Sequence, residues 1–173
     1  MRPPVTGAKI EKFMSALGQE VTGPGSVFFT GGVTALLHGW RDTTIDIDIK
    51  AMPEPAGFFQ AIALLKEREA VNIELASPDD FIPEIPGWRE RSLFIDRRGS
   101  VDFYHYDPYA QALAKIERGH IRDVADFESM VAAGLIHRAK LLELFTQIEP
   151  GLIRYPAVNG DVFRRKVERF MAS

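Results

Sequence analysis

The sequence contains no cysteine, which excludes disulfide bonds and thiolate metal sites and favours a reducing, cytoplasmic compartment. It has no apolar run long enough to span a membrane and no apolar signal region near the N-terminus, so we expect neither a membrane protein nor a secreted one. The net charge is only −3. This charge argues against broad, non-specific nucleic-acid binding, although a nucleic-acid end can still bind in a local basic pocket.

The length of 173 residues suits one domain, or one domain with a helical tail. An apolar fraction of 46% is ordinary for a globular protein and is enough to form a sizeable core. The sequence shows neither internal repeats nor low-complexity stretches. These features predict a compact, folded protein but say nothing of its chemistry.

A strictly alternating segment at residues 44–50 predicts a β-strand with two different faces. Its isoleucines point one way, and Asp46 and Asp48 point the other, because side chains in a strand have a period of two. The apolar face suits the core side of a sheet. Two carboxylates about 5 Å apart repel by roughly 3 kcal/mol at an effective dielectric of 20, and a divalent metal would remove that cost. A solvated outer face is the alternative, and the strand alone does not separate the two.

A glycine pair precedes that strand. Gly31 and Gly32 end the apolar strand predicted at 26–30 and open a short helix predicted at 33–38. Glycines at such a point allow backbone N–H groups to approach a ligand closely, and a helix N-terminus favours an anion such as phosphate. A tight turn that needs positive φ explains them equally well. Together, the two segments predict a phosphate-binding turn beside a pair of metal-binding carboxylates.

This order of strand, glycine pair, helix and Asp-x-Asp strand resembles the nucleotidyltransferase fold of the DNA polymerase β superfamily. The similarity is to the small bacterial AbiEii-like branch of nucleotidyltransferase toxins. The residues that carry it are Gly31, Gly32, Arg41, Asp46 and Asp48.

A second block is similar to the family's lysine helix followed by an Asp-x-x-Asp helix. Here Lys115 matches the lysine, and Asp123 and Asp126 match the acidic pair. We favour Asp126 as the functional acid, because Asp123 also suits an ordinary helix start. Arg118 lies on the same basic helical stripe as Lys115, although such a stripe is normally a solvated face.

The resemblance implies an α/β (α+β) fold with a small mixed sheet flanked by helices. We expect a nucleotidyltransferase core at 1–106 and a C-terminal helical subdomain at 107–173, packed as a single compact unit. It also implies Mg²⁺ or Mn²⁺ held by Asp46 and Asp48. Glu74, on the strand predicted at 71–76, is our candidate for a third metal ligand or a base, and Asp102 is its rival.

The same resemblance implies an NTP substrate, with phosphates met by Gly31, Gly32, Arg41 and Lys115. Arg118 is a further nucleotide-binding candidate. Thr34 is another, because its hydroxyl can replace the serine that often follows the first glycine in the family. The implied catalytic residues are Asp46, Asp48, Lys115 and Asp126.

The implied reaction is transfer of NMP to a tRNA end, a protein hydroxyl or a small molecule, and an antitoxin is a possible partner. A different class of function is a catalytically inactive, nucleotidyltransferase-fold binding or regulatory module. The glutamate in place of the usual third aspartate, and the absent serine, keep that alternative open.

Overall fold

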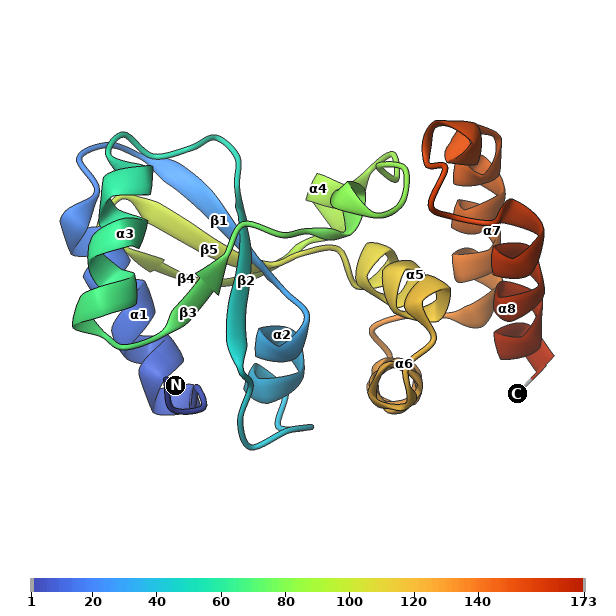
Figure 1. The fold of residues 1–173 in the computed structure, drawn as a ribbon, viewed down its shortest axis with the longest axis horizontal. Helices are drawn as coiled ribbons and strands as arrows, with labels where there is room; N and C mark the ends of the chain where they lie inside the picture. The colour runs from blue at the N-terminus through green and yellow to red at the C-terminus, as the bar shows by residue number, and fades with distance from the viewer. Residues whose placement is uncertain (1, 173) are drawn as a thin grey trace. The chain divides into compact units, whose positions relative to one another are not determined.

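The computed structural model describes residues 2–172, and their contacts divide the chain into two compact units (Figure 1). Unit 1 comprises Met1–Ser77 and Ser92–Tyr106, and unit 2 comprises Pro78–Arg91 and Asp107–Ser173. The elements of unit 1 are α1 (Gly7–Glu20), β1 (Gly25–Thr30), α2 (Gly32–Leu37), β2 (Asp46–Ala51), α3 (Phe58–Arg68), β3 (Asn72–Glu74), β4 (Leu93–Arg98) and β5 (Val101–His105). Those of unit 2 are η1 (Pro78–Asp80), α4 (Trp88–Arg91), α5 (Pro108–Arg118), α6 (Ile121–Ala132), α7 (Arg138–Ile148), η2 (Glu149–Arg154) and α8 (Gly160–Ala172).

The strands of unit 1 form one mixed sheet in the order β3-β2-β1-β5-β4. The central strand β1 runs antiparallel to β2 and parallel to β5. β3 adds in parallel to β2, and β4 pairs antiparallel to β5. The sequence prediction of an α/β protein with a mixed sheet is therefore confirmed.

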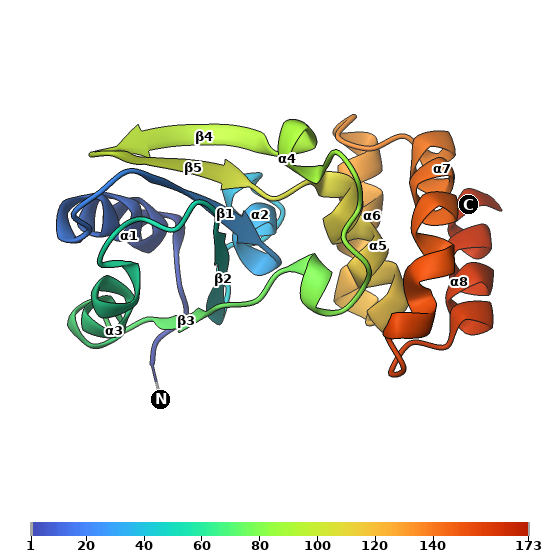
Figure 2. The same ribbon diagram turned by 90° about the horizontal axis from the view of Figure 1, so that it is seen from above.

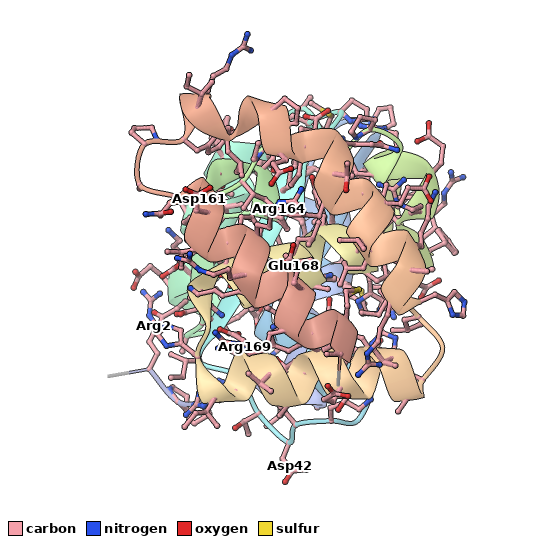
Figure 3. The ribbon with its side chains drawn as sticks, turned by 90° about the vertical axis from the view of Figure 1, so that its right-hand side faces the viewer. Arg2, Asp42, Asp161, Arg164, Glu168 and Arg169 are labelled. Carbon is pink, nitrogen blue, oxygen red and sulfur yellow. The ribbon has the colours of Figure 1, made fainter. Side chains whose placement is uncertain are left out.

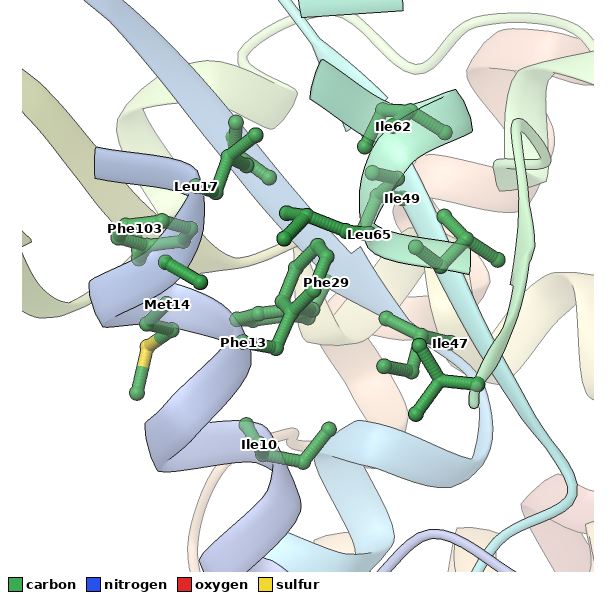
Figure 4. Close-up of a cluster of buried hydrophobic side chains, with 14 of the residues drawn as sticks. Ile10, Phe13, Met14, Leu17, Phe29, Ile47, Ile49, Ile62, Leu65 and Phe103 are labelled. Atoms are coloured by element: carbon green, nitrogen blue, oxygen red, sulfur yellow. The ribbon is translucent and has the colours of Figure 1, made fainter. Parts of the chain in front are cut away.

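One face of this sheet carries the core of unit 1. Figures 1 and 2 show α1 and α3 on the same side of the sheet, and their apolar side chains interdigitate with those of the strands in Figure 4. The ring of Phe29 lies 6.1 Å from that of Phe13 on α1 and 5.7 Å from that of Phe103 on β5. Ile47 and Ile49 of β2 are completely buried in the same cluster.

The alternation of β2 is confirmed, but the strand begins later than the sequence predicted. Asp46 is its first residue, and the preceding Thr44 instead forms an isolated bridge with Val5. Ile45 was expected to share the core face with Ile47, and that expectation is wrong, because its side chain is 63% exposed. The pleat orients side chains only within the ladder, and Ile45 lies before it.

The opposite face of the sheet carries the acidic side chains of β2. Thr30 pairs with Asp48, and Phe28 pairs with Lys50. Further along this face the ring of Phe28 stacks on that of Tyr104 at 4.9 Å. The alternation thus places apolar side chains of β2 on the core face of the sheet and its acidic side chains on the opposite face.

Unit 2 is helical, and its helix α5 begins and ends where its sequence specifies. Asp107 caps α5 by accepting the Tyr109 N–H at 3.0 Å, and Pro108 occupies the first turn, where its missing N–H costs nothing. Burial raises the pKa of the Asp107 carboxyl, and two hydrogen bonds from Arg91, at 2.7 and 3.0 Å, oppose that rise. Gly119 ends α5 with a φ of +74°, the left-handed conformation that glycine adopts readily.

The core of unit 2 is formed by α5, α6, α7 and α8. The ring of Phe163 on α8 meets that of Phe145 on α7 edge to face at 4.9 Å. Phe127 of α6 makes the same kind of contact with Phe170 of α8 at 4.6 Å. Across residues 2–172, the helices are all too short or too polar to traverse a bilayer.

Candidate functional site

Three carboxylates of unit 1 converge on one face of the sheet. Asp46 and Asp48 come from β2, and Glu74 ends β3, directly opposite Asp48 in the ladder. One ligand oxygen from each residue lies within 4.8 Å of the others. The pleat is responsible, because residues two apart on one strand and paired residues on neighbouring strands share a face. This cluster can bind a metal ion.

The carboxylate oxygens are close enough together to share one metal ion. Oxygens that ligate an octahedral Mg²⁺ at about 2.1 Å lie about 3 to 4 Å apart, so the observed group needs only a small contraction. Among residues 2–172, Asp46 and Glu74 form no ion pair with a lysine or arginine, and each side chain is at least partly exposed. Within residues 2–172, these two acids of the cluster therefore lack the cationic partners that accompany many other acids of the chain.

Gly31 leaves the space that the Asp48 carboxylate occupies. Its φ of +64° and ψ of −131° are rarely adopted by residues with a side chain. A Cβ atom at this position would lie 2.9 Å from Asp48 Oδ2. The glycine thus brings backbone directly against the acidic cluster.

Gly32 is needed for a different contact. A Cβ atom there would lie 2.1 Å from Thr44 Oγ1 and 2.8 Å from Thr44 Cβ. A shift of a few tenths of an ångström would not remove this clash. The helix that follows, α2, has only six residues, so its dipole is small. What distinguishes this turn is therefore the close approach of its backbone, more than the dipole of the helix that follows.

Two further predicted nucleotide ligands lie near this turn and differ in orientation. Arg41 has its guanidinium beside Gly32, with Nη1 3.6 Å from the position of a Cβ atom there. Thr34 is buried, and its hydroxyl lies 3.1 Å from His105 Nδ1. Thr34 therefore bonds to β5 on the core side of the sheet, while Arg41 lies at the glycine turn.

His105 was not singled out by the sequence, and it forms a buried ring cluster with His38. The two imidazole rings are 4.6 Å apart, and His38 also stacks on Trp40 at 4.8 Å. His38 Nδ1 donates to the Thr34 carbonyl at 2.8 Å, which makes it a structural histidine at the end of α2. Burial, followed by the nearby His38, lowers the pKa of His105 to about 3. The signal in the sequence was the placement of His105 on the apolar face of β5, two residues after Phe103.

Asp102, the rival third acid, does not belong to the cluster. It pairs with Ser26 in the ladder, whereas Asp48 pairs with Thr30. Those β1 partners are four residues apart, about 13 Å in an extended strand. Asp102 instead receives two hydrogen bonds from Arg97, at 2.6 and 3.0 Å, and they lower the pKa of its carboxyl. The structure brings Glu74, not Asp102, to the aspartate pair.

The remaining predicted residues form a separate, buried charge cluster in unit 2. Lys115 Nζ donates to Asp126 Oδ2 at 2.8 Å and lies 3.7 Å from Asp123 Oδ1. Arg118 binds Asp123 through two hydrogen bonds, at 2.7 and 2.8 Å. Burial would raise the pKa of Asp123, but the Arg118 hydrogen bonds and both cationic charges outweigh it, so that pKa is lowered. Two cations and two carboxylates balance one another between α5 and α6.

Comparison of the chain with protein-family models, with curated proteins and with solved structures found no match.

Replacing His105 tests the effect of its burial on stability. Between about pH 6.5 and pH 3 the unfolded chain binds a proton at this histidine that the folded protein does not, so folding loses stability as the pH falls. We expect the free energy of unfolding of the native protein, relative to His105→Gln, to fall by about 2 kcal/mol from pH 6.5 to pH 4.5. Urea unfolding at both pH values measures it, and equal pH dependence of the two proteins would contradict the buried, neutral histidine.

Removing the Lys115 ammonium should take away a buried cation that donates to Asp126 and lies near Asp123. We expect Lys115→Met to cost about 3–5 kcal/mol of unfolding free energy, and Lys115→Met/Asp126→Leu to recover much of that loss. Lys140→Met is the control, because Lys140 pairs with Glu143 on the surface of the same unit at 3.4 Å and should change stability by less than about 1 kcal/mol. Equal effects of the two single substitutions in urea unfolding would show that Lys115 is not part of a buried charge network.

Proposed function

We propose that this protein is a metal-dependent nucleotidyltransferase that uses an NTP as its donor. The observation that carries the proposal is the convergence of Asp46, Asp48 and Glu74 beside the backbone of Gly31. Carboxylate oxygens are the ligands that Mg²⁺ and Mn²⁺ take in sites where substrate phosphates complete the coordination. The glycine turn supports such a site, because it brings the backbone close to the carboxylates that would hold the cation.

In this proposal the roles of the residues follow from their places in unit 1. Asp46, Asp48 and Glu74 would hold the cation. When bound, a divalent cation lowers the pKa of an attacking hydroxyl and offsets charge that develops on the phosphates. The Gly31 and Gly32 backbone and the Arg41 guanidinium would bind the triphosphate.

The proposed reaction is a displacement at the α-phosphorus of the NTP. An acceptor oxygen forms a bond to that phosphorus, the bond to the bridging oxygen breaks, and pyrophosphate leaves. The acceptor proton would pass to solvent or to a carboxylate of the cluster, and Glu74, the most exposed of the three acids, is our candidate.

Lys115, Arg118 and Asp126 stay predictions from the family resemblance. Their charged groups are engaged with partners in unit 2, so a phosphate contact by Lys115 or Arg118 would require an exchange of those bonds. The acceptor, whether a tRNA end, a protein hydroxyl or a small molecule, and an antitoxin partner are likewise proposals from that resemblance.

Substitution of the two β2 aspartates tests the proposal. We expect the native protein to bind the α,β-methylene analogues of ATP, GTP, CTP or UTP in the presence of Mg²⁺, and Asp46→Asn/Asp48→Asn to weaken that binding by about a hundredfold or more, since it removes two of three charged ligands. Calorimetry with each analogue, with and without Mg²⁺, measures the effect. Asp102→Asn is the control, because Asp102 lies on the same sheet but outside the cluster, and it should match the native protein.

The outcome separates an enzyme from an inactive binding module. Metal-dependent binding that is lost only in the β2 variant supports a nucleotidyltransferase site. Binding that needs no metal, or that survives in that variant, would overturn the proposal and favour a binding module that uses the same fold. If no analogue binds to the native protein, the proposal is overturned as well.

A second substitution tests the glycine turn separately from the acids. Gly31→Ala retains all three carboxylates but places a Cβ atom 2.9 Å from Asp48 Oδ2 and strains a positive φ. We expect nucleotide analogue binding to weaken by about tenfold, which corresponds to roughly 1.4 kcal/mol of strain and lost contact. Gly39→Ala is the matched control, because Gly39 also has positive φ, at +80°, and has nothing within 4 Å of its Cβ position. Equal binding by the two variants would contradict a role for the turn.

A further inference from the structure

Unit 2 contains a pocket that the proposed nucleotidyl transfer does not use. It is formed by α5, α6 and α8 and has a volume of about 320 Å³, near the lower end of the range for small-molecule sites. Its apolar wall is made by Ile116, Val124 and Phe170, and its polar wall by Glu128, Lys166 and Arg169. Small-molecule sites commonly combine an apolar wall with a few convergent polar groups in this way.

The apolar wall is held in place by the core of unit 2. Ile116 is almost completely buried, and the Phe170 ring packs edge to face on Phe127 at 4.6 Å. Val124 is 42% exposed, although it is an apolar residue of α6. A ligand with an apolar body would therefore cover surface that now faces water.

The polar wall carries a net positive charge once the partners of its side chains outside the pocket are considered. Glu128 accepts hydrogen bonds from Arg138 at 3.1 and 3.2 Å, so a cation already balances it. Lys166 and Arg169 remain, and within residues 2–172 neither forms an ion pair with a carboxylate. The pocket is thus apolar on one side and cationic on the other.

The two cations differ in how firmly they are held. Lys166 Nζ donates to the Glu117 carbonyl at 2.7 Å, near the end of α5, and this bond uses only one of its three protons. The same Nζ atom lies 3.6 Å from the position that a Cβ atom would take at Gly119. Arg169 is exposed, and Figure 3 shows it on α8 beside α6. Lys166 is therefore a fixed donor, and Arg169 is a longer group able to adjust to an anion.

We propose that this pocket binds a small amphiphilic carboxylate. Its apolar body would lie against Ile116, Val124 and Phe170, and its carboxylate would lie between Lys166 and Arg169. A carboxylate suits the two cations because it can accept hydrogen bonds from both, and the guanidinium of Arg169 can bind it through two parallel bonds. This site does not depend on the proposed nucleotidyl transfer, because its residues all belong to unit 2.

Sodium octanoate is the probe that tests the pocket, added to the full chain and followed by calorimetry and by the methyl resonances of Ile116 and Val124. We expect a dissociation constant on the order of 1 mM or tighter, as is reasonable for a ligand of this size, with shifts at both methyl-bearing residues. Octan-1-ol and octylamine should bind at least about tenfold more weakly, because they lack the charge that the cations recognise.

Arg169→Gln should weaken octanoate binding by about tenfold. Arg165→Gln removes an exposed arginine of the same helix that does not line the pocket, so it should bind octanoate as the native protein does. Val124→Trp should block the pocket by volume alone and thereby reduce binding without altering the charge. Circular dichroism confirms that each variant is folded.

Three results would overturn the proposal. The first is no octanoate binding to the native protein, and the second is octan-1-ol binding as tightly as octanoate, which would show an apolar site that does not read charge. The third is equal weakening in the Arg169 and Arg165 variants, which would show attraction to the general positive charge of α8. Loss confined to Arg169→Gln and Val124→Trp supports a built carboxylate site.

Discussion

Repulsion between three carboxylates on one sheet face is the constraint around which unit 1 is organised. Asp46, Asp48 and Glu74 are held together by the pleat of β2 and by its parallel pairing with β3. Completely buried Ile47 and Ile49 on the reverse of β2 oppose that repulsion. A slip of one residue in register would expose those isoleucines and bury the acids, so the core fixes the register that creates the cluster. The glycine turn then becomes obligatory, because the Asp48 carboxylate fills the space that a side chain at Gly31 would need.

The chain contains a second group of acids, which shows a different solution to the same problem. In unit 2, Asp123 and Asp126 are buried, and Lys115 and Arg118 neutralise them with short hydrogen bonds. Burying charge is expensive, and internal cations repay that cost only when the geometry is good. In unit 1, Asp46 and Glu74 remain partly exposed and have no lysine or arginine as ion-pair partner within residues 2–172. The charge cluster of unit 2 is balanced by its own cations, whereas Asp46 and Glu74 would gain from a cation supplied by solution. This difference supports the proposed metal site.

The sequence predicted the features that depend on local periodicity. Alternation alone placed Asp46 and Asp48 on a shared face, because a strand repeats every two residues whatever its neighbours are. It did not show that Ile45 would be exposed, because the start of the strand is decided by the bridge between Thr44 and Val5, which are far apart in the sequence.

Features that depend on tertiary partners were beyond the sequence for a related reason. Lys115 was assigned to phosphate by resemblance, yet helical spacing cannot reveal that the next helix directs Asp126 toward its ammonium. The partner of Thr34 could not be predicted for the same reason, since His105 lies 71 residues later in the sequence. The choice between Glu74 and Asp102 required the strand order, because both lie on alternating strands. The strand of Glu74, β3, pairs with β2, whereas the strand of Asp102, β5, is separated from β2 by β1.

The final helix, α8, explains how a pocket can exist in unit 2 without weakening its core. Phe163 and Val167, one turn apart, are buried and hold the helix in place. Lys166 and Arg169, three residues apart, lie on a neighbouring face, while Phe170 follows Val167 by three residues and contributes to both the core and the pocket wall. Arg164 and Glu168 form an ion pair one turn apart on the exposed side, where Figure 3 labels them. Phe163 and Val167 do not line the pocket, and Arg169 is exposed. Substitutions at Arg169 should therefore alter the proposed recognition while the buried residues preserve the fold, and the proposed site is independent of the acidic cluster.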